Sequence, residues 1–418
     1  MFIKTCRLTN LDFSVNIAIS MPELSQKPQY RALEIIPGFL VWATFVFAII
    51  LSLFKPLWAI YIIILFDFYW LVKAVYWIVY LFYSYTVYRR ESKINWLERV
   101  TEIPQWQRIR HLVVLPTYKE PLEVLITTFE SLSEADYPLD KIMAVIGVEE
   151  RDKENGVYVA QEIIKRYKNK FGFLTYSVHP ANIPGELPGK GTNSCWAANH
   201  IKNEFIDPHN IPYEDIIIST FDVDTCPDKQ YFAHIAYKFL THLKPLQTSF
   251  QPIAFFNNNI WKSNAITRVV STSTTFWLLT DLSRPERLFT FSSHSMSFKT
   301  LVDVGFWQKD IVTEDSRIFL QCFMYFNGDY TVTPIFTSVS MDTVQSRGLW
   351  DTIKALYKQQ RRWAWGVEHF PYMVWHFSQN KLIPLKKKIY YFFNLAEGMY
   401  SWATAPIIII LLGRLYTV

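Results

Sequence analysis

The sequence contains only four cysteines in 418 residues, namely Cys6, Cys195, Cys226 and Cys322. They show none of the short spacings that hold a metal ion, which argues against a cysteine-bound metal site. We expect free thiols, because these residues lie in or near the segment that we assign below to the reducing cytoplasm.

The opening of the chain lacks a secretory signal peptide. Residues 1–20 contain neither a proper apolar region nor a cleavage site, and Met21 begins a segment typical of a cytoplasmic leader, so we interpret residues 1–20 as an upstream extension. The net charge of +5 reflects basic residues beside apolar segments at least as much as any anionic partner. It gives no reason to propose that the protein binds nucleic acid.

Charged residues are almost absent from three long apolar runs. Residues 35–54 contain no Lys, Arg, Asp or Glu, residues 56–85 contain only Asp67 and Lys73, and residues 389–413 contain one carboxylate. About twenty apolar residues cross a bilayer as a helix. We predict three transmembrane helices, with a buried core helix as the alternative for each.

Basic residues predict the orientation of these helices. Arg89, Arg90 and Lys93 follow the second run, and three lysines, 386–388, precede the third. Since cytoplasmic flanks carry the excess of Lys and Arg, the polar segment between them and the N-terminus should be cytoplasmic. The sequence therefore predicts an integral membrane protein, of a bacterial-type plasma membrane.

The polar middle of the chain alternates between short β-branched runs and helix-length segments. The predicted strands are 111–118, 141–148, 173–180 and 215–224, and the predicted helices between them are 120–135, 153–171 and 191–205. This alternation indicates an α/β fold with a parallel sheet that is covered on both faces. Such sheets bind ligands at the C-terminal ends of their strands.

Two carboxylates stand at the end of the fourth predicted strand. Asp222 and Asp224, in "FDVD", are spaced to share a hard divalent cation, which takes its other ligands from water and substrate phosphates. Without a cation their mutual repulsion would be unfavourable. The alternative is a solvated turn, because "DTCPD" is also typical of turns.

Three further motifs have both a structural and a functional interpretation. In "VTEDSRIF" (312–319), Thr313 is either an N-cap or part of an acidic site. "YKQQRRWAWG" (357–366) is either an interfacial helix or a binding element for phosphate and a sugar face. "PGKGTNS" (188–194) either opens a helix or brings Lys190 to a phosphate.

The ordered set PTYKE, VEERD, GKGTN, DVD, TED and QQRRW resembles membrane-bound family 2 glycosyltransferases, such as cellulose synthase, hyaluronan synthase and ceramide glucosyltransferase. The resemblance covers roughly residues 35–413. It implies a Rossmann-like domain of the GT-A type, inserted between transmembrane helices. The implied organisation is a cytoplasmic N-terminal segment (1–34), two transmembrane helices (35–88), a cytoplasmic glycosyltransferase domain (89–346), interfacial helices with QxxRW (347–388) and a transmembrane helix (389–413), with truncation after it left open.

The resemblance also implies a role for individual residues. The nucleotide-sugar contacts would be Pro116, Thr117, Tyr118, Glu120, Lys190, Asn193, Asp222, Gln359 and Arg362. Asp222 and Asp224 would hold Mg²⁺ or Mn²⁺, Asp315 would be the general base, and Glu314 and Trp363 would face the acceptor. Glu149 and Glu150 stand where the family usually has an aspartate pair, so they are expected to contact uracil or ribose with an altered reach.

The implied reaction is inverting transfer from a nucleotide sugar, expected to be a uridine diphosphate sugar, to a glycan or lipid acceptor at the cytoplasmic face of the membrane. The product would be β-linked, with a polysaccharide favoured over a glycolipid. The chain lacks the FxVTxK segment and the regulatory β-barrel domain of bacterial cellulose synthases. A transporter or a non-catalytic sugar-nucleotide sensor is the alternative from another class. The sequence does not identify further subunits.

Overall fold

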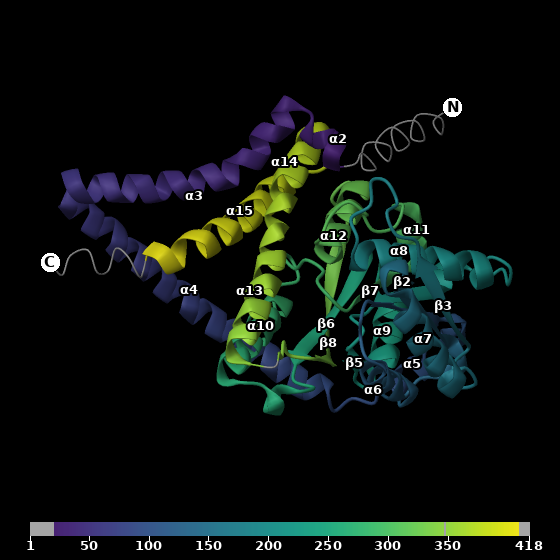
Figure 1. Ribbon diagram of the computed structural model, residues 1–418. Coiled ribbons are helices and arrows are strands. Elements are labelled where there is room, and N and C mark those ends of the chain that lie inside the picture. The colour runs from purple at the N-terminus through teal and green to yellow at the C-terminus, as the bar shows by residue number, and fades with distance from the viewer. Residues whose placement is uncertain (1–20, 347, 409–418) are drawn as a thin grey trace, which may run out of the picture. The chain divides into compact units, whose positions relative to one another are not determined.

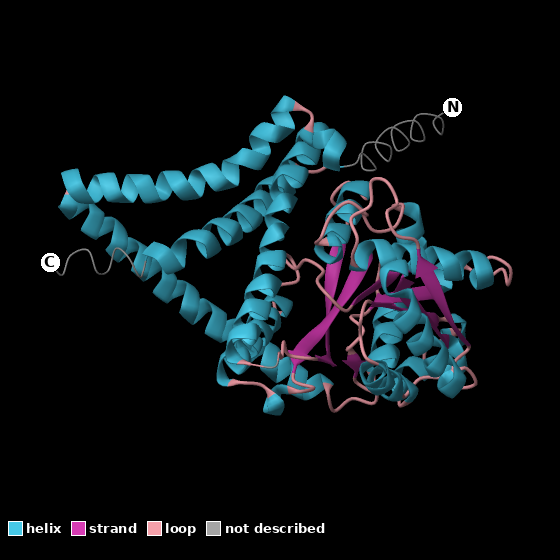
Figure 2. Cartoon of the chain, viewed as in Figure 1, coloured by secondary structure: helices cyan, strands magenta, loops and turns pink. Residues whose placement is uncertain are grey.

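The computed structural model describes residues 21–346 and 348–408 (Figure 1). The chain divides into two units, one formed by Met1–Phe82 with Trp365–Val418 and the other by Tyr83–Ala364. Figure 2 shows that the strands all lie in one part of the chain, whereas the remainder is helical. Cys195, Cys226 and Cys322 are free thiols, as expected, and Cys6 lies outside the described residues.

The first unit is helical. It contains the helices α2 (Met21–Ser25), α3 (Pro28–Phe54), α14 (His369–Gln379), α15 (Leu385–Ile407) and most of α4 (Pro56–Glu91). A proline at the first position of α3 supplies a fixed φ where no intrahelical N–H is needed. Helix α15 packs on α3, where the hydroxyl groups of Thr44 and Tyr400 are 2.7 Å apart.

Helices α3 and α4 correspond to the first two predicted transmembrane segments. Within residues 21–346 and 348–408, these two helices are long and apolar enough to cross a membrane. The third predicted segment, 389–413, begins inside α15 and ends outside the described residues. The charges in these segments are paired in part, because Lys73 forms an ion pair with Glu397, which also accepts a 2.6 Å hydrogen bond from Tyr69 Oη.

The second unit is built on an eight-stranded sheet in the order β3-β2-β1-β4-β7-β6-β8-β5. The strands are β1 (Arg110–Thr117), β2 (Ile142–Glu149), β3 (Phe173–His179), β4 (Ile216–Thr220), β5 (Cys226–Pro227), β6 (Thr248–Phe256), β7 (His294–Ser297) and β8 (Thr331–Met341). The first four correspond to the predicted strands and are parallel. The Leu, Val and Ile side chains of β1, β2 and β4 are buried on both faces, as expected for the interior of such a sheet, whereas β3 at the edge is only partly buried.

The expectation of a fully parallel sheet was wrong for the second half of the domain. Strand β7 runs antiparallel to both β4 and β6, and β5 runs antiparallel to β8, so the sheet is mixed. Strand β7, with the sequence "HSMS", has no apolar run of the kind that reveals a buried strand, and β5 has only two residues, Cys226–Pro227. Their positions in the sheet depend on pairing with neighbouring strands and could not be predicted from the sequence pattern.

Helices cover the sheet of the second unit (Figure 1). They are α5 (Trp96–Thr101), α6 (Leu122–Ser133), α7 (Lys153–Tyr167), α8 (Lys190–Ile201), α9 (Tyr231–Thr241), α10 (Ala265–Leu282), α11 (Phe298–Asp303), α12 (Glu314–Tyr325) and α13 (Leu349–Ala364). Helix α6 shows why they pack, because Leu125, Phe129 and Leu132 recur at helical spacing and are fully buried. The helices predicted at 120–135, 153–171 and 191–205 are α6, α7 and α8.

Candidate active site

The carboxyl ends of four parallel strands bring the predicted motifs to one edge of the sheet. Strand β1 ends at Thr117, β2 ends at Glu149, and Asp222 follows β4 by two residues. Because parallel strands present their carboxyl ends at the same edge, segments that are far apart in sequence meet there. Pro116 and Thr117 form the last two positions of β1, and Thr117 is buried.

Asp222 is bound by a lysine from a different motif. Lys190, the first residue of α8, places its Nζ 2.6 Å from Oδ1 of Asp222 and donates to Ser292 Oγ at 3.0 Å. The Ser292 hydroxyl in turn donates to Oδ2 of Asp222. Burial alone would raise the pKa of Asp222, but Lys190 and Ser292 together hold that pKa below its usual value. Asp222 therefore keeps its negative charge at neutral pH.

Asp224 lies among other acids. Its Oδ2 accepts a 3.1 Å hydrogen bond from the backbone N–H of Asp342, which follows β8. Burial raises the pKa of Asp224 to about 7, and the nearby charges of Asp222 and Asp342 add to that shift. Because burial and the neighbouring negative charges both disfavour the ionised form, a positive charge nearby would stabilise the Asp224 carboxylate. A divalent cation would relieve the repulsion, so the donor set fits Mg²⁺ or Mn²⁺.

The protein side chains alone do not make a closed metal site. Across residues 21–346 and 348–408, no group of three His, Cys, Asp or Glu side chains is placed to hold an ion. Mg²⁺ is commonly held by one or two carboxylates and completed by water and substrate phosphates. The arrangement around Asp222 and Asp224 is of that open kind.

Glu314 and Asp315 begin helix α12. Asp315 is partly exposed, and its Oδ1 accepts a 2.8 Å hydrogen bond from the backbone N–H of Ser316. Glu314 is buried against the start of α8, where a Cβ on Gly191 would come within 2.7 Å of Cγ of Glu314. Burial raises the pKa of both acids, and that of Glu314 reaches about 8 with the charge of Asp315 beside it.

One lysine connects the two acidic motifs. The charge of Lys190 lowers the pKa of both Glu314 and Asp315, and these acids together with Asp222 raise the pKa of Lys190 against the opposing effect of its burial. Arg362 contributes from α13, because its charge also lowers the pKa of Asp222 and Asp315. The DVD, TED, GKG and QxxRW motifs thus act on one another electrostatically.

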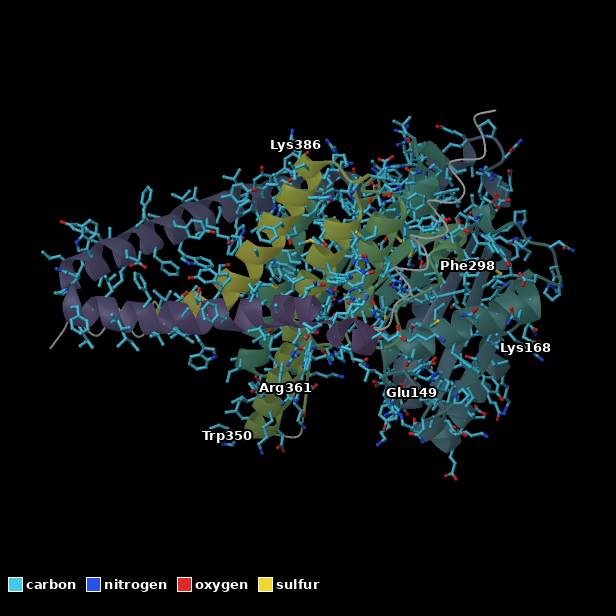
Figure 3. The ribbon with its side chains drawn as sticks, turned by 90° about the horizontal axis from the view of Figure 1, so that it is seen from above. Glu149, Lys168, Phe298, Trp350, Arg361 and Lys386 are labelled. Atoms are coloured by element: carbon cyan, nitrogen blue, oxygen red, sulfur yellow. The ribbon has the colours of Figure 1, made fainter. Side chains whose placement is uncertain are left out.

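Helix α13 carries the QxxRW motif. Figure 3 marks Trp350 and Arg361, both on this helix. Gln359 is half-buried, whereas Arg362 and Trp363 are exposed and Trp363 retains 39% of its surface. Exposed side chains beside the acidic motifs are free to contact a ligand.

The two glutamates after β2 are already engaged. Glu149, marked in Figure 3, is buried, and its Oε2 accepts a 2.8 Å hydrogen bond from Nε of Arg151. The Arg151 guanidinium lies 4.7 Å from the ring centroid of Tyr118, a cation–π distance. Glu150 accepts a 2.7 Å hydrogen bond from the backbone N–H of Ala181. These contacts shape a pocket lined by Glu149, Glu150, Arg151, His179, Pro180, Ala181, Asn182, Ile183, Glu186 and Pro188.

Two other predicted residues have distinct environments. Asn193 is buried, and its Nδ2 donates a 2.8 Å hydrogen bond to the carbonyl of Gly147, so it joins α8 to β2 inside the fold. Glu120 follows β1, and burial raises its pKa, with the charges of Asp342 and Asp222 adding to the shift. Glu120 therefore belongs to the acidic group around Asp224, whereas Asn193 is engaged in packing.

Sequence reasoning missed Ser292 and Asp342. Ser292 lies in "FSSH" next to Ser293 and His294, and it is the serine that contacts Asp222 and Lys190. His294 is buried and shares a hydrogen bond with the carbonyl of Phe291, which makes its role structural. The available signal for Asp342 was an acid directly after a strand, the same pattern that singled out Asp222.

Several solved structures resemble this chain at low sequence identity. Comparison with curated proteins gives no match. Among solved structures, the chain is similar to the mannosyltransferase PcManGT from Pyrobaculum calidifontis in complex with GDP-Man and Mn²⁺, with 15% identity, 81% of this chain and 85% of that chain covered, and a TM-score of 0.45. It is also similar to S. aureus TarS 1-349 in complex with UDP-GlcNAc, with 12% identity, 71% and 82% covered, and a TM-score of 0.35. A third similar structure is GalNAc-T7 with UDP, GalNAc and Mn²⁺, with 11% identity, 56% of this chain and 43% of that chain covered, and a TM-score of 0.37.

The sequence match is more specific than these distant structural likenesses. Residues 217–417 match the family described as "Glycosyl transferase family group 2". The predicted α/β fold class is confirmed by the eight-stranded sheet of the second unit and the helices around it, and the GT-A type stays a prediction. The matched segment contains the DVD, TED and QQRRW motifs.

Proposed function

We propose that this protein is a metal-dependent, inverting glycosyltransferase that uses a nucleotide sugar, with uridine diphosphate as the expected carrier. The observation that carries the proposal is the ion pair between Lys190 Nζ and Asp222 Oδ1 at 2.6 Å. The charge of Asp315 acts on Lys190, and the charge of Arg362 acts on Asp222. An ion, a leaving group and a base need charges of these kinds in one place. Residues from four separate motifs supply them.

The acidic loop is proposed to hold the cation. Asp222 and Asp224 would bind Mg²⁺ or Mn²⁺, which supplies Lewis-acid neutralisation of the diphosphate charge when bound. Lys190 and Arg362 would then stabilise the negative charge that develops on the departing diphosphate. Removal of one such electrostatic contact typically lowers the rate by about 10²–10³-fold.

Asp315 is proposed as the general base. The acceptor hydroxyl oxygen attacks the anomeric carbon while Asp315 takes its proton, and the bond from that carbon to the diphosphate oxygen breaks. Burial raises the pKa of Asp315, which makes its carboxylate a stronger base than an exposed aspartate. A single displacement converts an α-linked donor into a β-linked product.

Two apolar helices support a membrane setting for this reaction. Helices α3 and α4 have the length and composition of membrane-spanning segments. We propose that the domain works at the cytoplasmic face of a bacterial-type plasma membrane on a glycan or lipid acceptor, with a β-linked polysaccharide favoured over a glycolipid. The paired intramembrane charges Lys73 and Glu397 favour a structural role over a transport pathway.

The test is donor turnover by the purified full-length protein. UDP-glucose, UDP-GlcNAc and GDP-mannose are supplied in turn with Mg²⁺ or Mn²⁺, and release of the nucleoside diphosphate is measured with and without EDTA. The proposal predicts turnover of at least one donor, abolished by EDTA and restored by added metal. Folded protein that binds a nucleotide but turns over none of the donors would instead support a non-catalytic sensor.

A further inference from the structure

A buried glutamate joins two segments that lead into the candidate active site. Glu186 lies in the loop between β3 and α8, and its side chain is only 11% exposed. Its Oε1 accepts a 2.9 Å hydrogen bond from Nζ of Lys309, and its Oε2 lies 2.9 Å from Nε2 of His179. Glu186 and Lys309 are 123 residues apart in the sequence, so this contact joins two distant segments of the chain.

A backbone hydrogen bond strengthens the same connection. The N–H of Leu187 donates to the carbonyl of Lys309 at 2.9 Å. On the other side of the loop, Oγ1 of Thr192 donates to the carbonyls of Leu187 and Gly189 at 3.1 and 3.0 Å. The loop is thus fixed both to the start of α8 and to the segment before α12.

Each of the two joined segments leads to a charged residue of the candidate site, one to Lys190 and the other to Asp315. Glu186 stands four positions before Lys190, which contacts Asp222, and Lys309 stands six positions before Asp315. Hydrogen bonds to charged groups are among the stronger ones inside proteins. We therefore expect that loss of the Glu186–Lys309 contact changes the distance between Lys190 and Asp315.

The same loop forms one wall of the pocket beyond β2. Glu186 and Pro188 line this pocket together with Arg151 and with Glu149, the last residue of β2. The imidazole of His179, at the end of β3, also lines it and packs edge-on against the ring of Trp196 at 5.6 Å between centroids. Glu186 therefore contacts both the pocket wall and the segment leading to Asp315.

We propose that Glu186 is a positioning residue for sugar transfer: through Lys309 and His179 it holds the Lys190 loop against the segment that carries Asp315. The inference rests on the proposed function for its catalytic consequence. Its charge state suits the role, because Lys309 and His179 hold the pKa of Glu186 below its usual value although burial alone would raise it. The contact with Lys309 is accordingly ionic at neutral pH.

The experiment compares three single variants of the full-length protein and the Glu186→Gln/Lys309→Met double variant. Glu186→Gln and Lys309→Met each remove the ion pair from opposite sides. Glu162→Gln is the matched control, because the ion pairs of Glu162 within the described part of the chain are long, 3.9 Å to Lys165 and to Arg166 on the same helix α7. The measurements are hydrogen exchange of residues 180–189 and 307–313, the melting temperature, and kcat and KM with the best donor.

We expect the Leu187 amide to exchange about fivefold faster or more in both site variants, and kcat to fall about tenfold with KM for the donor changed less than about twofold. The double variant should be no worse than either single one, because both remove one interaction. Glu162→Gln should leave exchange and kcat unchanged. A merely structural role would lower the melting temperature without lowering kcat per folded molecule.

Unchanged exchange at Leu187 in both site variants would overturn the connection itself. Faster exchange with unchanged kcat would overturn the positioning role. If Glu186→Gln fails to fold, Lys309→Met decides by the same two readouts. No turnover of any donor by the wild type would overturn the proposed function and the catalytic part of this inference, whereas the exchange data would still decide the connection.

Discussion

Two pairs of neighbouring acids share one lysine but lie in different surroundings. Asp222 and Asp224 occupy the loop after β4, where Lys190 and Ser292 contact the first of them directly. Glu314 and Asp315 begin α12, where Glu314 is buried against α8. In the loop the pKa of Asp222 falls while that of Asp224 rises to about 7, whereas at the helix start both pKa values rise.

The difference separates two chemical tasks. A carboxylate that a lysine holds ionised, beside a second acid that lacks a counter-charge, is suited to bind a cation. An acid whose pKa is raised by burial next to an exposed approach is suited to exchange a proton. The structure therefore supports assigning the metal to the loop pair and the base to Asp315.

The largest expected effect comes from removing the base. Asp315→Asn should lower sugar transfer by about two to four decades, because a general-base step contributes that much, while nucleotide binding persists. Transfer is measured with a radiolabelled donor and binding by calorimetry with UDP and Mn²⁺. The control is Asp351→Asn, a change of an exposed acid on α13 that should leave both sugar transfer and nucleotide binding unchanged. A fully active Asp315→Asn protein would remove this residue from the role.

Removing the positive charge of Lys190, which both acid pairs share, should lower sugar transfer less than removing the base. Lys190→Met keeps the length of the side chain but removes the charge that faces both acid pairs. We expect transfer to fall about 10²-fold, within the range for the loss of one electrostatic contact to developing charge. Weaker binding of UDP should accompany the loss. Transfer within a factor of two of wild type would contradict the role of Lys190 at the leaving group.

The packing of α8 on α12 gives a smaller, structural test. A Cβ on Gly191 would come within 2.7 Å of Glu314, so Gly191→Ala should destabilise the domain by about 1–2 kcal/mol despite the better helix propensity of alanine. Gly189→Ala is the matched control, because a Cβ there meets nothing within 4 Å. Thermal melting of both variants measures the difference. Equal melting temperatures would mean that Glu314 moves aside without cost.

A separate test, which reads stability and not activity, is the pH dependence contributed by Glu314. Its pKa is about 8 in the folded state against 4.5 in the unfolded chain, so the folded state binds the extra proton between these values. Stability is therefore greatest at low pH and falls by up to about 1.4 kcal/mol per pH unit as pH rises through that window.

Glu314→Gln should remove that part of the pH dependence, because the amide does not ionise. Melting temperatures of the wild type and the variant, compared from pH 5 to pH 8, should converge at low pH and diverge in favour of the variant at high pH. Parallel curves would show that Glu314 is ionised in the folded protein.

The sequence predicts the first half of the domain better than the second. The strands β1, β2 and β4 are apolar runs that only a buried sheet accommodates, so their existence and direction follow from the pattern. Strand β7, with the sequence "HSMS", has no such run, and its pairing with β4 depends on contacts that form only in the folded domain.

The site shows the same limit. The resemblance to family 2 glycosyltransferases singled out Asp222, Asp315 and Arg362, whose charges do influence one another. It could not identify Ser292, because a serine becomes a partner of Asp222 only when β7 places it there. Asn193 belongs to a matched motif, yet its side chain is engaged by the carbonyl of Gly147.

The account depends on a cation bound between Asp222, Asp224 and the leaving diphosphate. Electron paramagnetic resonance of Mn²⁺, titrated into the protein with and without UDP, tests this most directly. We predict tight Mn²⁺ binding that requires UDP, is lost in Asp222→Asn and Asp224→Asn, and persists in Asp315→Asn. Mn²⁺ binding that is indifferent to UDP, or unchanged in the Asp222→Asn and Asp224→Asn proteins, would contradict the account.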